Sequence, residues 1–212
     1  MYCPAHFEED RPEVLRELMA RQPLATLVRT CADGLVADHI PLLHREDGSR
    51  FGRLLGHVAR ANPLWQAAAS EEMLLVFQGA QGYVSPNWYA SKAVDGRVVP
   101  TWNYAVVHVH GRLRAIEDAA GITGIVTALT DTHEAAQPHP WQVTDAPAEH
   151  TARLIANIVG IEIRITRMSG KWKVSQNQPA ANRASLVDAL TATGSSEAAA
   201  MAALVKGDIR QT

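Results

Sequence analysis

Two short segments carry side chains suited to binding a phosphate group and a planar ring. The first, residues 56–63 (GHVARANP), lies where a β-type run gives way to the start of a helix. Free backbone N–H groups and the helix dipole favour an anion at such a junction, and Arg60 can add a bidentate contact. The same spacing also fits a second interpretation, in which Asn62 only caps the helix and Arg60 lies in solvent.

The second segment, residues 99–104 (VPTWNY), follows Arg97 and combines hydroxyl, amide and indole groups. These groups can hydrogen-bond a heterocycle, and Trp102 can provide a flat wall. Composition alone favours the alternative, in which the Trp and Tyr fill a barrel core or a dimer seam. Both interpretations also apply to residues 83–89 (YVSPNWY).

A late segment, residues 171–177 (KWKVSQN), brings two lysines, a tryptophan and three polar side chains to one strand. It could close over a phosphate or a ring. Taken by itself, it is more typical of an edge strand whose lysines oppose aggregation.

Other kinds of chemistry lack their local signatures. His108 and His110 face the same side of a strand, but no Cys or third His follows at ligand spacing, so we predict no metal site. His139, between two prolines, is a weaker candidate still. The chain has no Gly-x-Gly-x-x-Gly, no Walker-type Gly-Lys-Ser/Thr and no Gly-x-Ser-x-Gly. Nucleotide binding of the Rossmann or P-loop type and serine hydrolysis are therefore excluded.

The bulk composition is that of an ordinary globular protein, with 212 residues, 47% of them hydrophobic, and a net charge of -2. This charge gives no broad positive field to attract nucleic acid. Two cysteines are too few for a disulfide framework, and residues 1–10 do not form a signal peptide. We therefore expect a cytoplasmic protein without a membrane span.

The candidate segments need a sheet to position them. Hydrophobic periodicity predicts a helix over 11–20, strands over 24–30, 34–44 and 51–58, a short helix after Asn62, a strand over 72–78, a loop over 79–96 and a strand over 98–116. Helices are predicted over 117–134 and 147–157, strands over 161–167 and 172–175, and helices over 181–190 and 197–205. This order predicts a mainly β fold, a β-barrel with α helices. We expect a domain over 1–178 and a helical C-terminal extension over 179–212.

Taken in order along the chain, several segments together resemble the FMN-binding negative transcriptional regulators of the PaiB type. They are residues 1–7 (MYCPAHF), 39–43 (HIPLL), 56–63 (GHVARANP), 83–86 (YVSP) with Trp88 and Tyr89, 98–104 (VVPTWNY) and 173–177 (KVSQN). The resemblance extends to about residue 190.

This resemblance implies an FMN-binding split β-barrel related to pyridoxamine-phosphate oxidase, working as a homodimer with FMN at the subunit interface. The residues that it places around FMN are His39, Ile40, Pro41, Leu42, His57, Ala59, Arg60, Asn62, Thr101, Trp102, Asn103, Lys173, Ser175 and Gln176. Within this set we assign Arg60 and Lys173 to the phosphate. His57, Ala59 and Asn62 are assigned to phosphate hydrogen bonds, and Thr101, Trp102 and Asn103 to the ring.

The resemblance also implies repression of transcription, and DNA as a partner on that ground alone. Residues 181–190 carry only Arg183 and residues 197–205 carry no basic side chain, so no recognition helix is evident. The alternative is an FMN-dependent oxidoreductase acting on a small molecule beside Tyr83, Trp88 and His108. A third hypothesis is a flavin or haem carrier with histidine ligands. No residue is identified as a catalytic acid, base or nucleophile, because flavin itself supplies the hydride chemistry.

Overall fold

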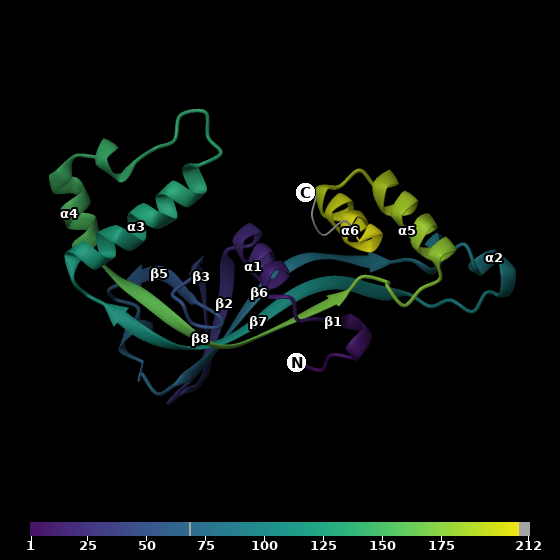
Figure 1. Cartoon of the computed structure of the whole chain (residues 1–212), viewed down its shortest axis with the longest axis horizontal. Helices are drawn as coiled ribbons and strands as arrows, with labels where there is room; N and C mark the ends of the chain where they lie inside the picture. The colour runs from purple at the N-terminus through teal and green to yellow at the C-terminus, as the bar shows by residue number, and fades with distance from the viewer. Residues whose placement is uncertain (68, 208–212) are drawn as a thin grey trace. The chain divides into compact units, whose positions relative to one another are not determined.

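The computed structural model describes residues 1–67 and 69–207 (Figure 1). Within them lie eight strands of one sheet and six α-helices. The helices are α1 (Pro12–Arg21), α2 (Lys92–Asp95), α3 (Ala119–Glu134), α4 (Ala148–Ala156), α5 (Ala180–Ala192) and α6 (Ser196–Lys206). Four short 3-10 helices are η1 (Ala5–Phe7), η2 (Pro63–Gln66), η3 (Pro86–Trp88) and η4 (Val143–Asp145). The predicted mainly β class with helices is confirmed.

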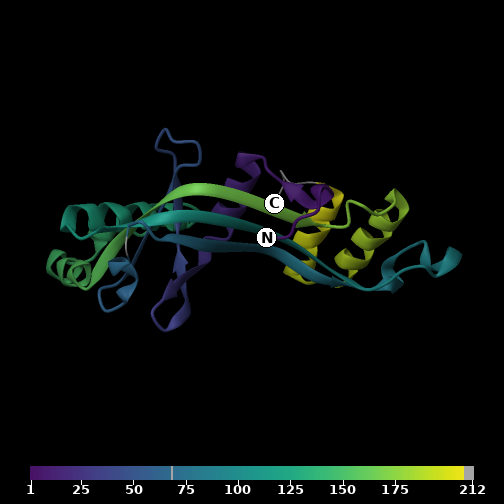
Figure 2. The same cartoon turned by 90° about the horizontal axis from the view of Figure 1, so that it is seen from below.

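The sheet follows the strand order β3-β2-β6-β7-β8-β5-β4, and β1 also pairs with β8. The pairings β1–β8, β2–β3, β2–β6, β4–β5 and β5–β8 are antiparallel. Figure 2 shows the long strands β6, β7 and β8 running side by side. The strands are β1 (Glu8–Glu9), β2 (Leu24–Cys31), β3 (Gly34–Pro41), β4 (Leu43–Arg45), β5 (Arg53–Ala59), β6 (Glu72–Val84), β7 (Thr101–Ile116) and β8 (Ile158–Lys173).

The structure corrects the sequence prediction in two places. The predicted loop over 79–96 is wrong in its first part, where β6 continues to Val84, and η3 and α2 occupy much of the rest. The two predicted late strands are one continuous strand, β8, which runs through Gly170. A Cβ at Gly170 would lie 2.4 Å from Leu15 Cδ2 and 2.8 Å from the Glu9 carbonyl, so the strand can pass only where this side chain is absent.

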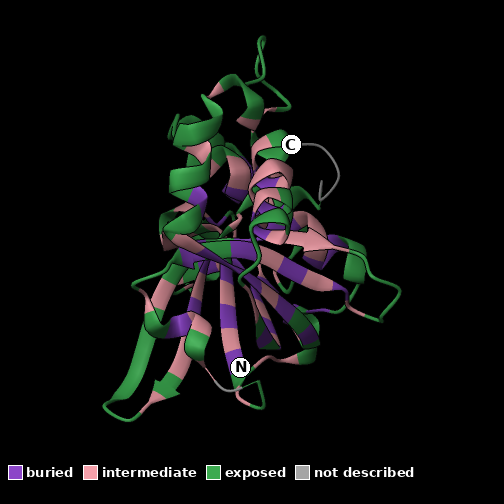
Figure 3. Cartoon of the chain, turned by 90° about the vertical axis from the view of Figure 1, so that its left-hand side faces the viewer, coloured by how far each residue is buried: buried purple, intermediate pink, exposed green. Residues whose placement is uncertain are grey.

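The chain forms two compact units. Unit 2 contains Met19–Phe77 and Val109–Met168. Along β5 every second residue is buried, whereas β3 is exposed along most of its length; Figure 3 colours the strands by burial. Its core contains the fully buried Leu27, Leu54, Leu75, Phe77, Ile161 and Ile163. Helix α3 begins after Asp118, whose Oδ1 accepts a hydrogen bond from Gly121 N at 2.7 Å, and buries Ile122, Ile125 and Leu129 along one face.

Unit 1 contains Met1–Leu18, Gln78–His108 and the described part of Ser169–Thr212. Helices α5 and α6 bury Leu186, Leu190, Met201 and Val205. Ser185 Oγ on α5 donates to the Trp88 carbonyl at 2.8 Å, which fixes α5 to η3. The predicted boundary after residue 178 stays a prediction.

The buried Lys171 of β8 contacts the first residues of the chain. Lys171 is 8% exposed, and its Nζ donates to the Tyr2 carbonyl at 3.1 Å. The same Nζ lies 5.2 Å from the centre of the Tyr104 ring and 5.7 Å from that of Tyr2, which is cation–π geometry. In the sheet, Lys171 is paired with Glu8 of β1. The segment before α1 is therefore part of unit 1.

Candidate functional site

Four of the predicted binding residues line one polar cavity in unit 1, with a volume of about 450 Å³. They are Thr101 and Asn103 of β7, Lys173 at the end of β8, and Ser175 just after it. The segments that carry them are about 70 residues apart in the sequence, as the Asn103–Ser175 separation of 72 shows. The structure therefore brings these two segments together within unit 1.

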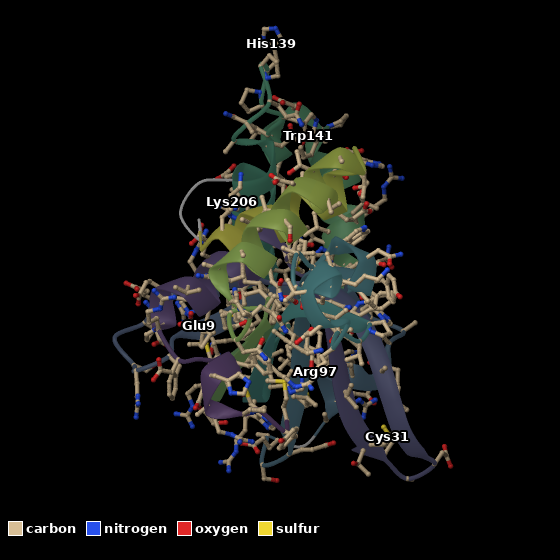
Figure 4. All side chains as sticks on the ribbon, turned by 90° about the vertical axis from the view of Figure 1, so that its right-hand side faces the viewer. Glu9, Cys31, Arg97, His139, Trp141 and Lys206 are labelled. Carbon is tan, nitrogen blue, oxygen red and sulfur yellow. The ribbon has the colours of Figure 1, made fainter. Side chains whose placement is uncertain are left out.

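Lys173 is one of the cations that line this cavity. Its Nζ donates to the Trp102 carbonyl at 2.9 Å and to Thr101 Oγ1. Arg97, which also lines the cavity and is labelled in Figure 4, is a second cation there. Asp95 also lines the cavity, and its Oδ1 accepts a hydrogen bond from Arg97 N at 2.9 Å. With two cations against this one carboxylate, the cavity suits a phosphate or another anion.

Asn103 and Ser175 form a buried pair in the wall, 1% and 4% exposed respectively. Asn103 Nδ2 donates to Ser175 Oγ at 2.9 Å, and Ser175 Oγ lies 3.2 Å from Asn103 Oδ1. Ser175 has φ of +62°, a left-handed conformation that is costly for a residue with a side chain. Burial raises the pKa of the neighbouring Tyr89, while a hydrogen bond with Ser175 opposes this shift. The wall is therefore rigidly organised around Ser175.

Two further predicted residues, Trp102 and Gln176, do not line this cavity. Trp102 is 49% exposed, and its Nε1 donates to Gln81 Oε1 at 3.1 Å. Alternate residues of a strand face opposite sides of the sheet, so Trp102 does not share the cavity of Thr101 and Asn103. Gln176 folds back onto its own turn, where its Oε1 accepts from Val174 N at 2.8 Å.

The remaining predicted residues lie in unit 2, where the structure brings β3 and β5 together. Ile40 and Leu42 are buried, and a Cβ at Gly56 would lie 2.6 Å from Leu42 Cδ2 and 3.0 Å from the Pro41 carbonyl. Glycine thus allows β5 to approach the segment of His39, which is itself exposed. Beyond β5, Asn62 Nδ2 donates to Asp38 Oδ1 at 2.7 Å. The two predicted segments are therefore neighbours.

Arg60 and Asn62 already have structural partners. Asn62 Oδ1 accepts from Leu64 N at 2.8 Å and so caps η2, as the second interpretation proposed. Arg60 Nε and NH2 donate to the carbonyls of Ala156 and Ile158 at 3.0 and 3.1 Å, and its NH1 lies 3.5 Å from Glu117. These contacts use three of the five guanidinium N–H groups and hold Arg60 beside the end of α4. The assignment of Arg60 to the phosphate stays a prediction. So does the assignment of Ala59, which is exposed beside it.

We expect Arg60→Ala to lower the free energy of unfolding more clearly than it lowers the affinity for FMN. The guanidinium lies at the C-terminal end of α4, where a cation contributes about 0.3–1 kcal/mol. A urea titration that reports the free energy of unfolding measures this loss. An unchanged stability together with a large loss of FMN affinity would instead show that Arg60 binds the phosphate.

A second cavity, of about 330 Å³, lies in unit 2 beside Pro41 and His57. His133, Glu134 and Trp141 also line it, and the sequence did not indicate them as site residues. These three residues lie at least 76 positions after His57 in the sequence, so they form no short motif with it. Trp141 N donates to Glu134 Oε2 at 3.0 Å. Partial desolvation lowers the pKa of His57, although its side chain is still exposed to solvent, and so favours the neutral imidazole.

We predict that His57 titrates at a lower pH than an ordinary histidine. The pKa of His57 is lower in the folded protein than in the unfolded chain. The folded state therefore loses stability as the pH falls from the pKa of the unfolded chain to that of the folded protein. At neutral pH, His57 has no such effect. The chemical shift of its Hε1 proton, followed by NMR from pH 8 to 4.5 and assigned with His57→Gln, gives the pKa. A pKa at or above the ordinary value would contradict the prediction.

The histidine pair on β7 has ordinary protein partners. His110 Nε2 lies 2.9 Å from Arg167 NH2, and its Nδ1 lies 3.6 Å from Glu72. Across residues 1–67 and 69–207, no group of three His, Cys, Asp or Glu side chains is arranged to hold a metal ion. In the same residues, no helix is long and apolar enough to cross a membrane.

Comparison with known proteins identifies a family. Residues 1–167 match the family described as "Putative FMN-binding domain". An uncharacterized protein of Emericella nidulans is 30% identical over 97% of this chain and 96% of its own length. The protease synthase and sporulation protein PAI 2 of Bacillus subtilis is 26% identical over 100% of this chain and 99% of its own length.

Two solved structures share the fold. The flavocytochrome Anf3 of Azotobacter vinelandii superposes with a TM-score of 0.61 at 17% identity, over 79% of this chain and 69% of that one. The FAD and heme binding protein of Mycobacterium smegmatis gives a TM-score of 0.58 at 20% identity, over 78% and 73% of the two chains. At these identities the similarity concerns the fold, and it supports the predicted split β-barrel.

Proposed function

Because this chain belongs to the FMN-binding domain family, we propose that it binds the phosphate of FMN in the cavity of unit 1 and acts as a flavin-dependent regulator. The polar cavity around Lys173 is the observation that carries the proposal. FMN combines a dianionic phosphate with a planar ring and polar ring edges, so it needs cations, hydrogen-bonding groups and flat walls. The cations and the hydrogen-bonding groups are present in this cavity.

The residues of unit 1 fit the anionic part of FMN. Lys173 and Arg97 supply positive charge, and Thr101 supplies a hydroxyl beside Lys173 Nζ. Asn103 and Ser175 hold the wall in place through their mutual hydrogen bond.

We further propose a homodimer in which each FMN contacts both subunits. Support comes from the two separate sets of predicted residues and from the resemblance stated above. A two-fold symmetric dimer would form two equivalent sites from one pair of surfaces. When bound, FMN supplies the redox chemistry, and the protein's side chains bind it, orient it and exclude water.

The regulatory part of the proposal rests on the resemblance in sequence and on the similarity to PAI 2 over the whole chain. The two C-terminal helices offer few cations for DNA, since α5 carries Arg183 and α6 carries Lys206. We therefore propose that regulation acts through a protein surface that changes when FMN binds. Direct and specific DNA binding would require another basic surface.

FMN titration of the flavin-free protein, with the molecular mass followed by light scattering, tests the binding mode. We expect one FMN per chain and a dimer in the loaded form. A monomer that binds FMN with full affinity would refute the shared site. Failure to bind FMN in either state would refute the proposed function as a whole.

Two further assays test the regulatory role. NADH or NADPH should leave the absorbance of the bound flavin unchanged, whereas rapid bleaching would favour the oxidoreductase. A mobility-shift assay at physiological salt, with excess non-specific competitor, should show no specific DNA complex. A complex that survives the competitor would establish DNA as the partner in place of a protein surface.

A further inference from the structure

The cavity of unit 2 contains groups that FMN binding does not require. Its lining residues are Pro41, His57, Leu129, Thr130, His133, Glu134 and Trp141. We propose that this cavity binds a second planar heteroaromatic molecule, uncharged or positively charged, stacked on Trp141. The inference rests on the proposed function only in that Pro41 and His57 are also assigned to the flavin.

The chain holds Trp141 at the rim of the cavity. Its backbone N–H donates to Glu134 Oε2 at 3.0 Å, which connects it to the end of α3. On its other side, Gln142 N donates to Asp145 Oδ2 at 2.9 Å and so attaches the residue to η4. Figure 4 labels two residues of the loop between α3 and η4: His139 lies at its tip, and Trp141 lies nearer the helices. The backbone at Trp141 is thus held on both sides, and its side chain is 46% exposed, so the indole is accessible for stacking on a ligand.

The other walls provide polar and apolar contacts. Thr130, His133 and Glu134 have the spacing of one helix face on α3, so their side chains reach the cavity together. Leu129 and Pro41 add apolar surface. Hydroxyl and imidazole groups can hydrogen-bond the substituents of a ring, while Trp141 covers its face.

The charge of the lining selects among planar ligands. Within the described part of the chain, no lysine or arginine is among the residues that line this cavity, and Glu134 is its carboxylate. Partial desolvation lowers the pKa of His57 and so favours its uncharged form. A carboxylate or phosphate would therefore lack a fixed partner, whereas a cationic ring gains from Glu134 and from the face of Trp141.

The volume limits the ligand to a small one. At about 330 Å³ the cavity is near the lower end of the range of roughly 300–1,000 Å³ for ligand sites. It has room for one ring with its substituents. Nicotinamide, 1-methylnicotinamide and nicotinate have similar size and shape and differ in charge, so they form a matched set of probes.

NMR of the indole N–H groups tests the proposal directly in the full chain. The protein has five tryptophans, and the Trp141 signal is the one that disappears in Trp141→Phe. We expect nicotinamide and 1-methylnicotinamide to shift the Trp141 signal, and nicotinate to bind about tenfold more weakly. Trp102, 49% exposed and located in unit 1, is the matched control whose signal should stay unchanged.

Variants separate stacking from charge. Trp141→Ala should weaken binding about tenfold, measured through ligand-detected NMR, while Trp141→Phe should retain most of it. Glu134→Gln keeps an acceptor for the Trp141 N–H and should abolish the preference for 1-methylnicotinamide over nicotinamide. Equal shifts of Trp102 and Trp141, or equal binding of nicotinate, would overturn the proposal.

Repeating the titration with FMN present distinguishes the two sites. If FMN shifts the Trp141 signal and displaces nicotinamide, the cavity holds the flavin ring, and the proposal of a second ligand fails while FMN binding stands. If flavin fluorescence shows no FMN binding and nicotinamide still shifts Trp141, the proposed function fails and the second site stands. We expect FMN and nicotinamide to bind together.

Discussion

Replacing Lys173 with alanine is expected to weaken FMN binding roughly tenfold to hundredfold. A hydrogen bond to a charged group is worth about 1.5–3 kcal/mol, and Lys173 is one of the cations that line the unit 1 cavity. Its present partners, Thr101 Oγ1 and the Trp102 carbonyl, hold the ammonium group in the cavity. Titration of the flavin-free protein, followed by flavin fluorescence, gives the dissociation constant.

Lys206→Ala is the matched control, because it removes the same charge from α6 of the same unit, at a residue outside this cavity. Its FMN affinity should equal that of the unchanged protein. Equal losses in both variants would mean that net charge alone governs binding. An unchanged dissociation constant in Lys173→Ala would exclude this lysine from the phosphate site.

The second large effect is expected at Asn103. Asn103→Leu removes both hydrogen-bonding atoms from a side chain that is 1% exposed and leaves the Ser175 hydroxyl buried without this partner. Such a loss costs about 1–3 kcal/mol in the free energy of unfolding. Because Ser175 lies in the cavity wall, FMN affinity should also fall. Denaturant titration measures the first effect, and the flavin titration above measures the second.

A double-mutant cycle shows whether the pair itself is responsible. Adding Ser175→Ala to Asn103→Leu removes the hydroxyl that Asn103 no longer satisfies and should recover part of the lost stability. Ser175→Gly should by itself relieve backbone strain, because glycine adopts a φ of +62° without cost. Strictly additive losses would show that the Asn103–Ser175 hydrogen bond does not stabilise the protein.

Periodicity in the sequence predicted most of the sheet, and it failed where burial does not alternate. Residues 79–84 carry two glycines and no regular apolar pattern, so the end of β6 gave no strand signal. Residues 168–170 (MSG) similarly suggested a break in β8. Only the folded structure shows that Gly170 lies against Leu15 and the Glu9 carbonyl, more than 150 residues away in the sequence.

The candidate site could be predicted in part. The two segments around Thr101 and Lys173 meet as expected, but strand alternation turns Trp102 away, a fact that the segment's composition alone could not reveal. Trp141 stayed unrecognised because no motif links it to His57. The course of α3 and the hydrogen bond from Trp141 N to Glu134 place both residues around one cavity.

The pairing of β1 with β8 has a consequence for biosynthesis. Glu8 of β1 can pair with Lys171 of β8 only after the ribosome has added a further 163 residues. At ~5–20 residues per second, the first strand stays without its partner for roughly ten to thirty seconds. During vectorial synthesis, residues 19–77 emerge long before unit 1 can be completed. The nascent chain therefore exposes its N-terminal segment to chaperones until translation has passed Lys171.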